Sequence, residues 1–237
     1  MSMQQMALEL GLAPAPSLEN FVAEGNAEVL AHLRLWAGNP QRSPVPTYLW
    51  GLPGSGKSHL LQAVRAQLEQ QTRPDGLPVR VGWLSAQDMQ HAVAFDPAWE
   101  AVLLDDCDLY TAEQQAIAFN WFVNAQTPES GPARWVLAAG AVAPAGLQLR
   151  EDLRTRLGWG HVFQLQVLAE ADRRAVLRRA ADDRGVFLGD EVMDFMLKRF
   201  SRDLSSLMVL LDRLDGYALR TQRAITIPLV KAMLESE

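Results

Sequence analysis

Residues 51–58 constrain the fold of this chain more than any other segment. They read Gly-Leu-Pro-Gly-Ser-Gly-Lys-Ser, which fits the pattern G-x-x-x-x-G-K-[ST], and they lie between a short apolar run and a helical pattern. Glycines allow such a loop to wrap phosphate groups with its backbone N–H groups, and the following helix presents its positive end to them. The segment therefore predicts a nucleotide site between a β-strand and an α-helix. The alternative, a glycine turn with an accidental lysine, is disfavoured by this context.

Each part of this loop has a chemical role in the prediction. Lys57 would neutralise the β- and γ-phosphate charge, and the Ser58 hydroxyl would ligate Mg²⁺. The residues assigned to nucleotide binding are Gly51, Pro53, Gly54, Ser55, Gly56, Lys57, Ser58 and His59.

Strand and helix patterns alternate through the first two thirds of the chain. Short apolar runs at 47–50, 79–84, 101–104, 135–139 and 162–165 predict strands, and residues 26–36, 56–71 and 112–125 predict helices, the first capped by Asn26. This order predicts an α/β fold with a parallel, doubly wound, five-stranded sheet.

The strand patterns end near residue 168. Helical patterns follow at 170–184, 190–200 and 204–221, and a last one runs from Pro228 to Leu234, which predicts a small all-helical domain. We therefore expect a flexible tail at 1–16, a nucleotide-binding α/β domain at 17–167 and a helical domain at 168–237.

Two carboxylates end the predicted strand at 101–104. Asp105 would hold Mg²⁺, partly through water, and Asp106 lies where P-loop enzymes often polarise the attacking water. A strand that ends in Asp-Asp is by itself usually only the start of a solvated loop. Its spacing from residues 51–58 favours the functional interpretation.

Composition limits the cellular compartments and the classes of partner that we expect for this chain. The single cysteine, Cys107, excludes an intramolecular disulfide and favours a reducing compartment, so we expect a cytoplasmic protein. No run approaches the ~20 apolar residues of a membrane span, and no membrane role is expected. The net charge of −6 and the balanced charges after residue 161 argue against a DNA-binding module within this chain.

Residues 149–160 hold a third candidate feature. Arg150 and Arg154 are four residues apart beside Glu151 and Asp152, as on a helix face that pairs its own charges. Arg156 differs in register and precedes a Gly-Trp-Gly turn, where a guanidinium can be presented to the phosphate of another molecule. A surface salt bridge is the ordinary alternative for such an arginine.

Together these motifs carry a family resemblance that spans nearly the whole chain. The P-loop, the Asp-Asp strand end, the Arg-Leu-Gly-Trp-Gly segment and the helical C-terminal domain resemble AAA+ ATPases of the bacterial replication initiator (DnaA) clade. Within that clade, residues 197–199, 211–215 and 226–231 are similar to the Hda-type regulatory inactivators, whose helical domain is called the lid. No basic helix-turn-helix pattern follows the lid, as it would in an initiator. Residues 21–22 and 25–26 resemble the adenine-pocket segment of the clade; the alternative is a helix cap with a hydrophobic neighbour.

The resemblance implies a negative regulator of replication initiation. It would bind nucleotide (ADP as the resemblance implies, although the sequence leaves ADP or ATP open) with Mg²⁺, and would stimulate hydrolysis of the ATP bound to DnaA by supplying Arg156 as an arginine finger in trans. Its partners would be DnaA and the β sliding clamp of DNA polymerase III, with DNA contacted only indirectly through the clamp, at the nucleoid or replisome. A homodimer is an open possibility.

The N-terminal tail resembles the clamp-docking motif of these inactivators. It contains Gln5, Met6, Leu8 and Leu10 before a Pro-rich spacer. In an extended peptide, alternate leucines can enter a groove while the glutamine anchors the segment through hydrogen bonds. A bare Q-x-x-L-x-L hexamer is weak evidence, and an unpartnered tail is the alternative.

Two expected parts of a self-sufficient ATPase are altered. Residues 138–141 read Ala-Ala-Gly-Ala where the clade has polar sensor residues, and Ser205 stands where we align the sensor arginine of the lid, with Arg202 three residues earlier as a substitute. Because phosphoryl transfer depends on such groups, we expect nucleotide binding to survive and hydrolysis by this chain to be weak or absent. The alternatives are an autonomous AAA+ ATPase or helicase loader acting on single-stranded DNA, and a clamp adaptor with a structural nucleotide.

Overall fold

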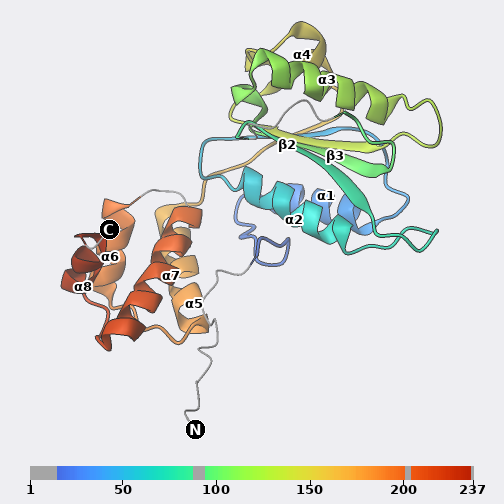
Figure 1. The fold of residues 1–237 in the computed structure, drawn as a ribbon. Coiled ribbons are helices and arrows are strands. Elements are labelled where there is room, and N and C mark those ends of the chain that lie inside the picture. The colour runs from blue at the N-terminus through green and yellow to red at the C-terminus, as the bar shows by residue number, and fades with distance from the viewer. Residues whose placement is uncertain (1–14, 88–93, 201–203, 236–237) are drawn as a thin grey trace. The chain divides into compact units, whose positions relative to one another are not determined.

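The computed structural model describes residues 15–87, 94–200 and 204–235 (Figure 1). Its contacts divide the chain into two compact units, one formed by Pro16–Val167 and one that begins at Leu168.

The first unit is an α/β layer structure. Its elements are α1 (Ala27–Gly38), β1 (Thr47–Trp50), α2 (Lys57–Glu69), β2 (Arg80–Ser85), β3 (Trp99–Asp105), the 3₁₀ turn η1 (Cys107–Leu109), α3 (Ala112–Gln126), β4 (Trp135–Gly140), the 3₁₀ turn η2 (Pro144–Gly146), α4 (Glu151–Leu157) and β5 (His161–Gln164). The five strands pair in the order β2-β3-β4-β1-β5, and every pairing is parallel. The predicted five-stranded parallel sheet is therefore confirmed.

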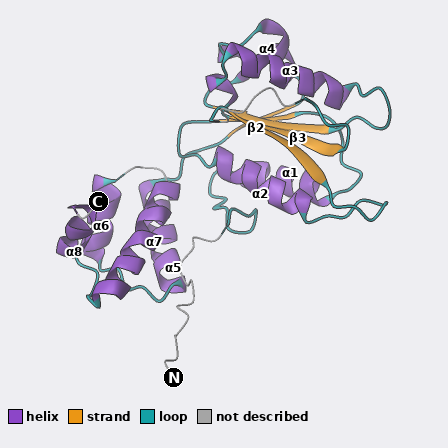
Figure 2. Cartoon of the chain, viewed as in Figure 1, coloured by secondary structure: helices purple, strands orange, loops and turns teal. Residues whose placement is uncertain are grey.

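Side chains alternate between the two faces of this sheet, and each face has its own core. Leu49 packs with α1 and α2, while the adjacent Tyr48 packs with α3 and α4. In β3, Leu103 and Leu104 divide in the same way. Figure 2 shows α1 and α2 on one side of the strands and α3 and α4 on the other. Because both faces are covered, the central strands are apolar throughout rather than alternating with polar residues.

Strand β3 is longer than the predicted run of 101–104, since it starts at Trp99 and ends at Asp105. The ring of Trp99 lies over Gly82 of β2, where a Cβ would come within 2.5 Å of it, and 4.6 Å from the ring of Trp121 in α3. The packing of this indole extends the strand by two residues toward its start. The missing side chain at Gly82 makes the close approach possible.

The second unit is all-helical, as predicted. It contains α5 (Glu170–Asp183), α6 (Asp190–Arg199), α7 (Leu204–Thr221) and α8 (Ile227–Glu235). Apolar residues spaced three and four apart on these helices converge on one core, with Leu177, Met193, Leu211 and Val230 fully buried.

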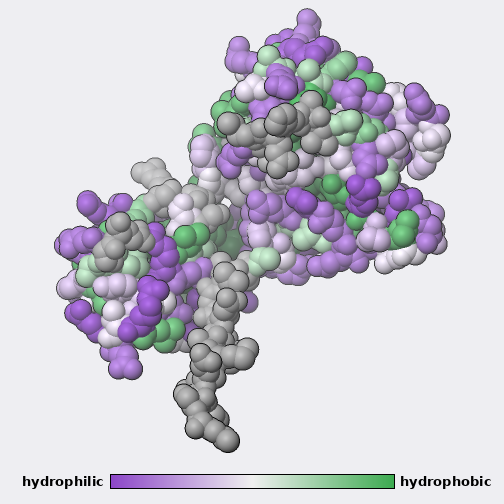
Figure 3. Space-filling model, in the orientation of Figure 1, coloured by the Kyte–Doolittle hydropathy of each residue, from purple (hydrophilic) through white to green (hydrophobic). Residues whose placement is uncertain are grey.

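Hydrophilic residues cover most of the visible face of each unit, with hydrophobic residues in small separated areas (Figure 3). Among the described residues, none of the helices combines the length and apolar character that crossing a membrane requires.

Candidate nucleotide site

The predicted phosphate-binding loop leaves the sheet at the carboxyl end of β1. Gly51 bonds through its N–H to the Gly140 carbonyl, and α2 begins at Lys57. Gly54 and Gly56 have backbone φ angles of 81° and 90°, a conformation that residues with a side chain rarely adopt. A Cβ on Gly51 would lie 2.5 Å from the Leu165 carbonyl oxygen, so glycine is required there by close packing. The loop therefore has the tight backbone on which phosphate binding depends.

Polar groups in this loop are buried and poorly satisfied. Lys57 is 7% exposed, and its Nζ donates to the carbonyls of Gly51 at 2.8 Å and Leu52 at 3.3 Å. Burial lowers the pKa of Lys57, while Asp106 and the neighbouring acids oppose that shift. The buried hydroxyl of Ser55 has no hydrogen-bond partner among the residues that the structure describes. A phosphate group would accept hydrogen bonds from the buried Ser55 hydroxyl and from the Lys57 ammonium, which in this structure donates to loop carbonyls.

The remaining P-loop residues follow from the same geometry. Pro53 and Gly54 form the exposed to half-buried outer part of the loop, and Ser58 and His59 lie in the first turn of α2. The first backbone N–H groups of a helix lack partners within it, so the start of α2 offers donors as well as a positive dipole end.

Asp105 and Asp106 end β3 at the same edge of the sheet. Asp105 is 4% exposed, and burial raises its pKa to about 6 despite a hydrogen bond with the Ser58 hydroxyl. Its Oδ1 accepts the N–H of Asp106, which has a left-handed φ of 52°. Burial also raises the pKa of Asp106, against the effect of Lys57. The structure thus brings Lys57, Ser58, Asp105 and Asp106 together.

No group of three or more His, Cys, Asp or Glu side chains within the described ranges could enclose a metal ion. A magnesium ion at this edge would be held by Asp105 and Ser58 together with waters and phosphate oxygens. That is the usual coordination of Mg²⁺ in nucleotide sites.

Residues 17–26 cover the start of α2. The ring of Phe21 lies where a Cβ on Gly56 would project, at 2.6 Å, and 5.7 Å from the ring of His59. His59 Nε2 is 3.1 Å from the carbonyl oxygen of Ser17, and burial lowers the pKa of this imidazole. In this structure His59 therefore contacts the N-terminal segment with its ring.

The capping role predicted for the Asn26 side chain is wrong. Asn26 precedes α1, but its side chain makes no cap hydrogen bond. Nδ2 donates to the carbonyl of Gln166 at 3.0 Å, and Oδ1 accepts the N–H of Gln166 at 2.8 Å. This reciprocal pair joins residues 17–26 to the segment after β5. The long-range partner satisfies the amide and so replaces the local cap. Helix α1 also continues past the predicted end at Trp36 to Gly38.

The alanine-rich segment lies at the end of β4. Ala138 and Ala139 are buried within the strand, and Gly140 ends it. The N–H of Ala141 donates to Oδ1 of Asp108 at 2.8 Å. Sequence reasoning missed Asp108, whose only local signal was its place in the run Asp-Asp-Cys-Asp. Arg202 lies outside the described residues, as does the side chain of Ser205, although its backbone belongs to α7.

Arg156 lies in the last turn of α4 and is half-buried. Its guanidinium carbon is 5.4 Å from the centre of the Phe119 ring in α3, and that of Arg150 is 4.7 Å from the same ring. Arg150, the N-cap residue of α4, pairs with Asp152, whereas neither Arg154 nor Arg156 forms an ion pair with any described residue. The predicted helix face that pairs its own charges is therefore only partly formed. Trp159, in the following turn, is 66% exposed. Sequence reasoning missed Phe119 as the support for Arg156.

The proposed clamp-docking residues, Gln5, Met6, Leu8 and Leu10, lie outside the described residues.

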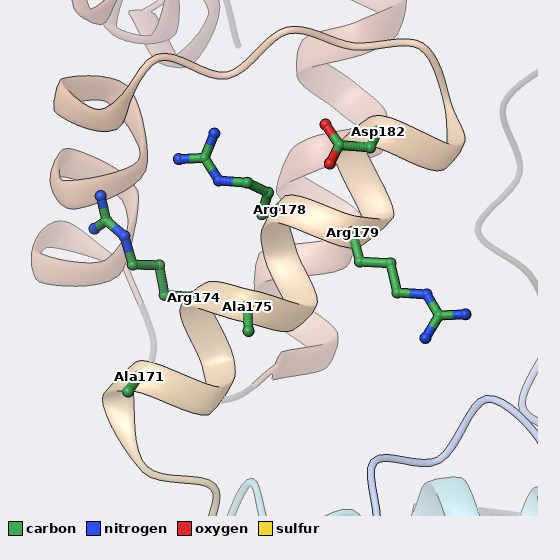
Figure 4. Close-up of a pocket in the computed structure, with 6 residues that line it drawn as sticks. All are labelled: Ala171, Arg174, Ala175, Arg178, Arg179 and Asp182. Carbon is green, nitrogen blue, oxygen red and sulfur yellow. The ribbon is translucent and has the colours of Figure 1, made fainter.

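A separate hollow of about 420 Å³ lies beside α5 in the helical unit. Figure 4 shows Arg174 and Arg178 pointing away from Arg179. Arg174 pairs with Asp190 and Asp194 of α6, and Arg178 also pairs with Asp190. The charges of Arg174 and Arg178 beside the hollow are therefore paired with carboxylates of the same helical unit.

Comparisons with known proteins agree with this architecture. The bacterial DnaA ATPase domain family matches residues 12–164, and the Hda lid domain family matches residues 170–234. An uncharacterised protein of Haemophilus influenzae is 32% identical over 237 residues, covering 98% of each chain.

Solved structures share the fold at lower identity. Domain III of the Thermotoga maritima replication initiation protein DnaA superposes with a TM-score of 0.74 at 21% identity, covering 95% of this chain and 98% of that one. AMPPCP-bound DnaA of Aquifex aeolicus superposes with a TM-score of 0.63 at 21% identity, covering 88% of this chain and 68% of that one. The Thermotoga maritima RuvB branch migration motor superposes with a TM-score of 0.62 at 18% identity, covering 93% of this chain and 72% of that one.

Proposed function

We propose that this chain, which belongs to the bacterial DnaA ATPase domain family and carries an Hda lid domain, stimulates hydrolysis of the ATP held by DnaA. The chain is a DnaA-related AAA+ protein and a replication regulator by family. Its regulatory effect would be negative, because hydrolysis converts the initiator to its ADP form.

The observation that carries the proposal is the state of Arg156. Its guanidinium lies against the Phe119 ring and has no carboxylate partner within the described residues, so its charge is available to an incoming anion. An arginine that reaches another subunit's γ-phosphate stabilises the charge that develops during phosphoryl transfer, by about 10³- to 10⁵-fold in rate. The exposed Trp159 supplies apolar area beside it.

Nucleotide bound by this chain would have a conformational role. The loop at residues 51–58 would hold the phosphates of ADP or ATP, with Mg²⁺ at Ser58 and Asp105. The small residues at the end of β4 offer no side chain to orient an attacking water, which supports weak or absent turnover by this chain. Asp106 remains the candidate base if turnover occurs.

The tail would place the protein where it acts. Residues 5–10 would bind the β sliding clamp, so DNA is contacted through the clamp and the protein works in the cytoplasm at the nucleoid. Tethering raises the effective concentration of a weak second contact, so clamp-bound protein would reach DnaA while free protein would not. Homodimer formation by this chain is a separate part of the proposal.

The decisive experiment measures phosphate release from DnaA preloaded with γ-labelled ATP. The reaction is assembled with and without this protein, and with clamp either loaded on DNA or omitted. A separate control contains this protein and ATP alone. We expect release only when DnaA, loaded clamp and this protein are all present.

Two results would contradict the proposal. Release by this protein and ATP alone would establish the alternative of an autonomous ATPase, whose P-loop and strand-end aspartates are intact in this chain. Clamp association without any effect on DnaA would leave the chain as an adaptor.

A further inference from the structure

Residues 17–21, here called the N-terminal strap, lie against the start of α2. The N–H of Ser17 donates to Asn20 Oδ1 at 3.0 Å, and the N–H of Asn20 donates to the Ser17 hydroxyl at 3.1 Å. Leu18, between them, is 1% exposed and packs in the core that contains α1 and α2. Local hydrogen bonds and one buried leucine therefore fix the conformation of the strap.

Two side chains hold the backbone of the strap. Arg34 of α1 donates from Nη2 to the Leu18 carbonyl at 3.0 Å, and His59 Nε2 lies 3.1 Å from the Ser17 carbonyl oxygen. His59 belongs to the first turn of α2, the helix that begins at Lys57. The histidine thus joins the strap directly to the element that carries the phosphate loop.

The imidazole of His59 is a neutral hydrogen-bond donor in this contact. A carbonyl oxygen only accepts, so Nε2 carries the proton. Burial lowers the pKa of His59, which keeps the ring neutral at neutral pH. A neutral ring whose N–H already serves the strap offers no positive charge to a phosphate. The contact therefore favours a role in arranging the strap over direct binding of phosphate.

Phe21, at the end of the strap, reaches the phosphate loop. One of its ring carbons lies 2.6 Å from the place that a Cβ on Gly56 would take, and its ring centre is 5.7 Å from that of His59. The side chain is only half-buried. A nucleotide held by its phosphates in the loop has its nucleoside close by, and an aromatic face is a surface on which a base can stack.

We propose that His59 is a positioning residue of the nucleotide site, which holds the strap so that Phe21 lies beside the phosphate loop and does not itself touch the nucleotide. The inference rests on the proposed nucleotide binding at residues 51–58. Removal of the imidazole would then weaken contacts to the nucleoside, while the phosphates keep Lys57 and the backbone donors of the loop.

Calorimetric titration of the full chain with Mg-ADP and with Mg-pyrophosphate separates these two parts. Pyrophosphate carries two phosphates without a nucleoside, so it reports on the loop alone. We expect His59→Ala to weaken ADP binding by about fivefold to tenfold, because the strap loses a hydrogen bond and a ring contact, and to leave pyrophosphate binding unchanged. Gln62→Ala, an exposed position on the same helix, is the matched control and should bind both ligands as the wild type does.

Two further variants test whether His59 acts through the strap. His59→Gln keeps an N–H that can donate to the Ser17 carbonyl, so it should recover part of the ADP affinity. If His59 acts through Phe21, the double variant of His59→Ala and Phe21→Ala should bind ADP no more weakly than Phe21→Ala alone. Thermal melting of each variant without ligand verifies that the fold is retained.

Four outcomes would overturn the inference. Unchanged ADP affinity in a folded His59→Ala variant contradicts the role of His59. An equal loss for ADP and pyrophosphate would assign His59 to the phosphates, and an additive loss in the double variant would separate it from Phe21. If a folded wild type binds neither ligand, the proposed nucleotide site fails and the inference fails with it.

Discussion

The guanidinium carbon of Arg156 lies 5.4 Å from the centre of the Phe119 ring. This contact joins the last turn of α4 to the middle of α3, and Arg150 occupies the same ring at 4.7 Å. The aromatic surface restricts the side chain of Arg156 without neutralising its charge. A preoriented, unpaired guanidinium loses less conformational entropy when it meets a phosphate than a free arginine would.

Arg156→Ala should reduce stimulated hydrolysis of DnaA-bound ATP by about 10³-fold, because the charge that stabilises the transition state is lost. Binding to the clamp should stay unchanged. Phosphate release from preloaded DnaA measures the first effect, and retention on immobilised clamp measures the second. Arg154→Ala, on the same helix, is the matched control, and full activity of Arg156→Ala would exclude the finger role.

Phe119→Leu should lower the stimulated rate by about fivefold, since the loss of a cation–π contact is worth about 1 kcal/mol. Phe119→Tyr keeps the aromatic face and should retain the wild-type rate. The assay is the same phosphate release, run well below the melting temperature of each variant so that a stability change does not enter. Equal rates for leucine and tyrosine would show that the ring does not position Arg156.

Lys57→Ala should weaken ADP binding, because its ammonium is the buried cation of the phosphate loop. A ligand at 100 times its dissociation constant stabilises a protein by about 2.7 kcal/mol. At the ADP concentration that stabilises the wild type by this amount, ADP should stabilise the Lys57→Ala variant far less. Thermal melting with and without ADP measures the effect, and Lys231→Ala in α8 is the control. An equal gain in Lys57→Ala would contradict the assignment.

Replacing Gln5, Leu8 and Leu10 together with alanine should abolish clamp association without changing the melting temperature. This prediction rests on the sequence pattern, in which the tail precedes the folded units. Clamp-column retention and thermal melting are the two measurements. Retention of the triple variant would mean that the clamp, if it is bound at all, is bound elsewhere.

His32 should make the stability of the first unit depend on pH. Its ring stacks on Trp36, and its Nε2 lies 2.9 Å from the Thr47 hydroxyl oxygen. Burial, and secondarily the nearby His161, lower the pKa of His32 from 6.5 to about 4. The unfolded chain therefore binds a proton that the folded chain does not, so stability is fully present above pH 6.5 and is lost as the pH falls toward 4.

Urea unfolding at about pH 7.5 and about pH 5 checks this prediction. His32→Gln, which keeps a polar amide near Thr47, should lose less stability over the same interval than the wild type. Equal losses in the two proteins would assign the pH dependence to other groups.

The sequence predicted the features that depend on local spacing. The loop around Lys57 and the acids at Asp105 and Asp106 are fixed by residues within one strand–loop–helix unit or one strand end. Parallel pairing then brings both motifs to one edge of the sheet, because the carboxyl ends of all five strands share it. Strand number and the helical lid followed from periodicity in the same way.

The contacts that sequence reasoning missed join distant parts of the chain. The Asn26 side chain was assigned to a local cap, yet its partner is 140 residues away. Asp108 reaches a backbone N–H 33 residues later, and Phe119 meets Arg156 only once α3 and α4 share a face of the sheet. Neither periodicity nor motif spacing encodes such pairs, since they depend on how the elements pack.

Because of the two hydrogen bonds between Asn26 and Gln166, positions 26 and 166 should tolerate mutation to different degrees. Gln166 contributes only main-chain atoms, so its side chain can be exchanged without touching the two hydrogen bonds. Asn26 must offer a donor and an acceptor on one short side chain. Aspartate at that position would set a carboxylate against the Gln166 carbonyl, and alanine would leave both main-chain groups unpaired. In a collection of random variants, position 26 should therefore accept few residues while position 166 accepts many.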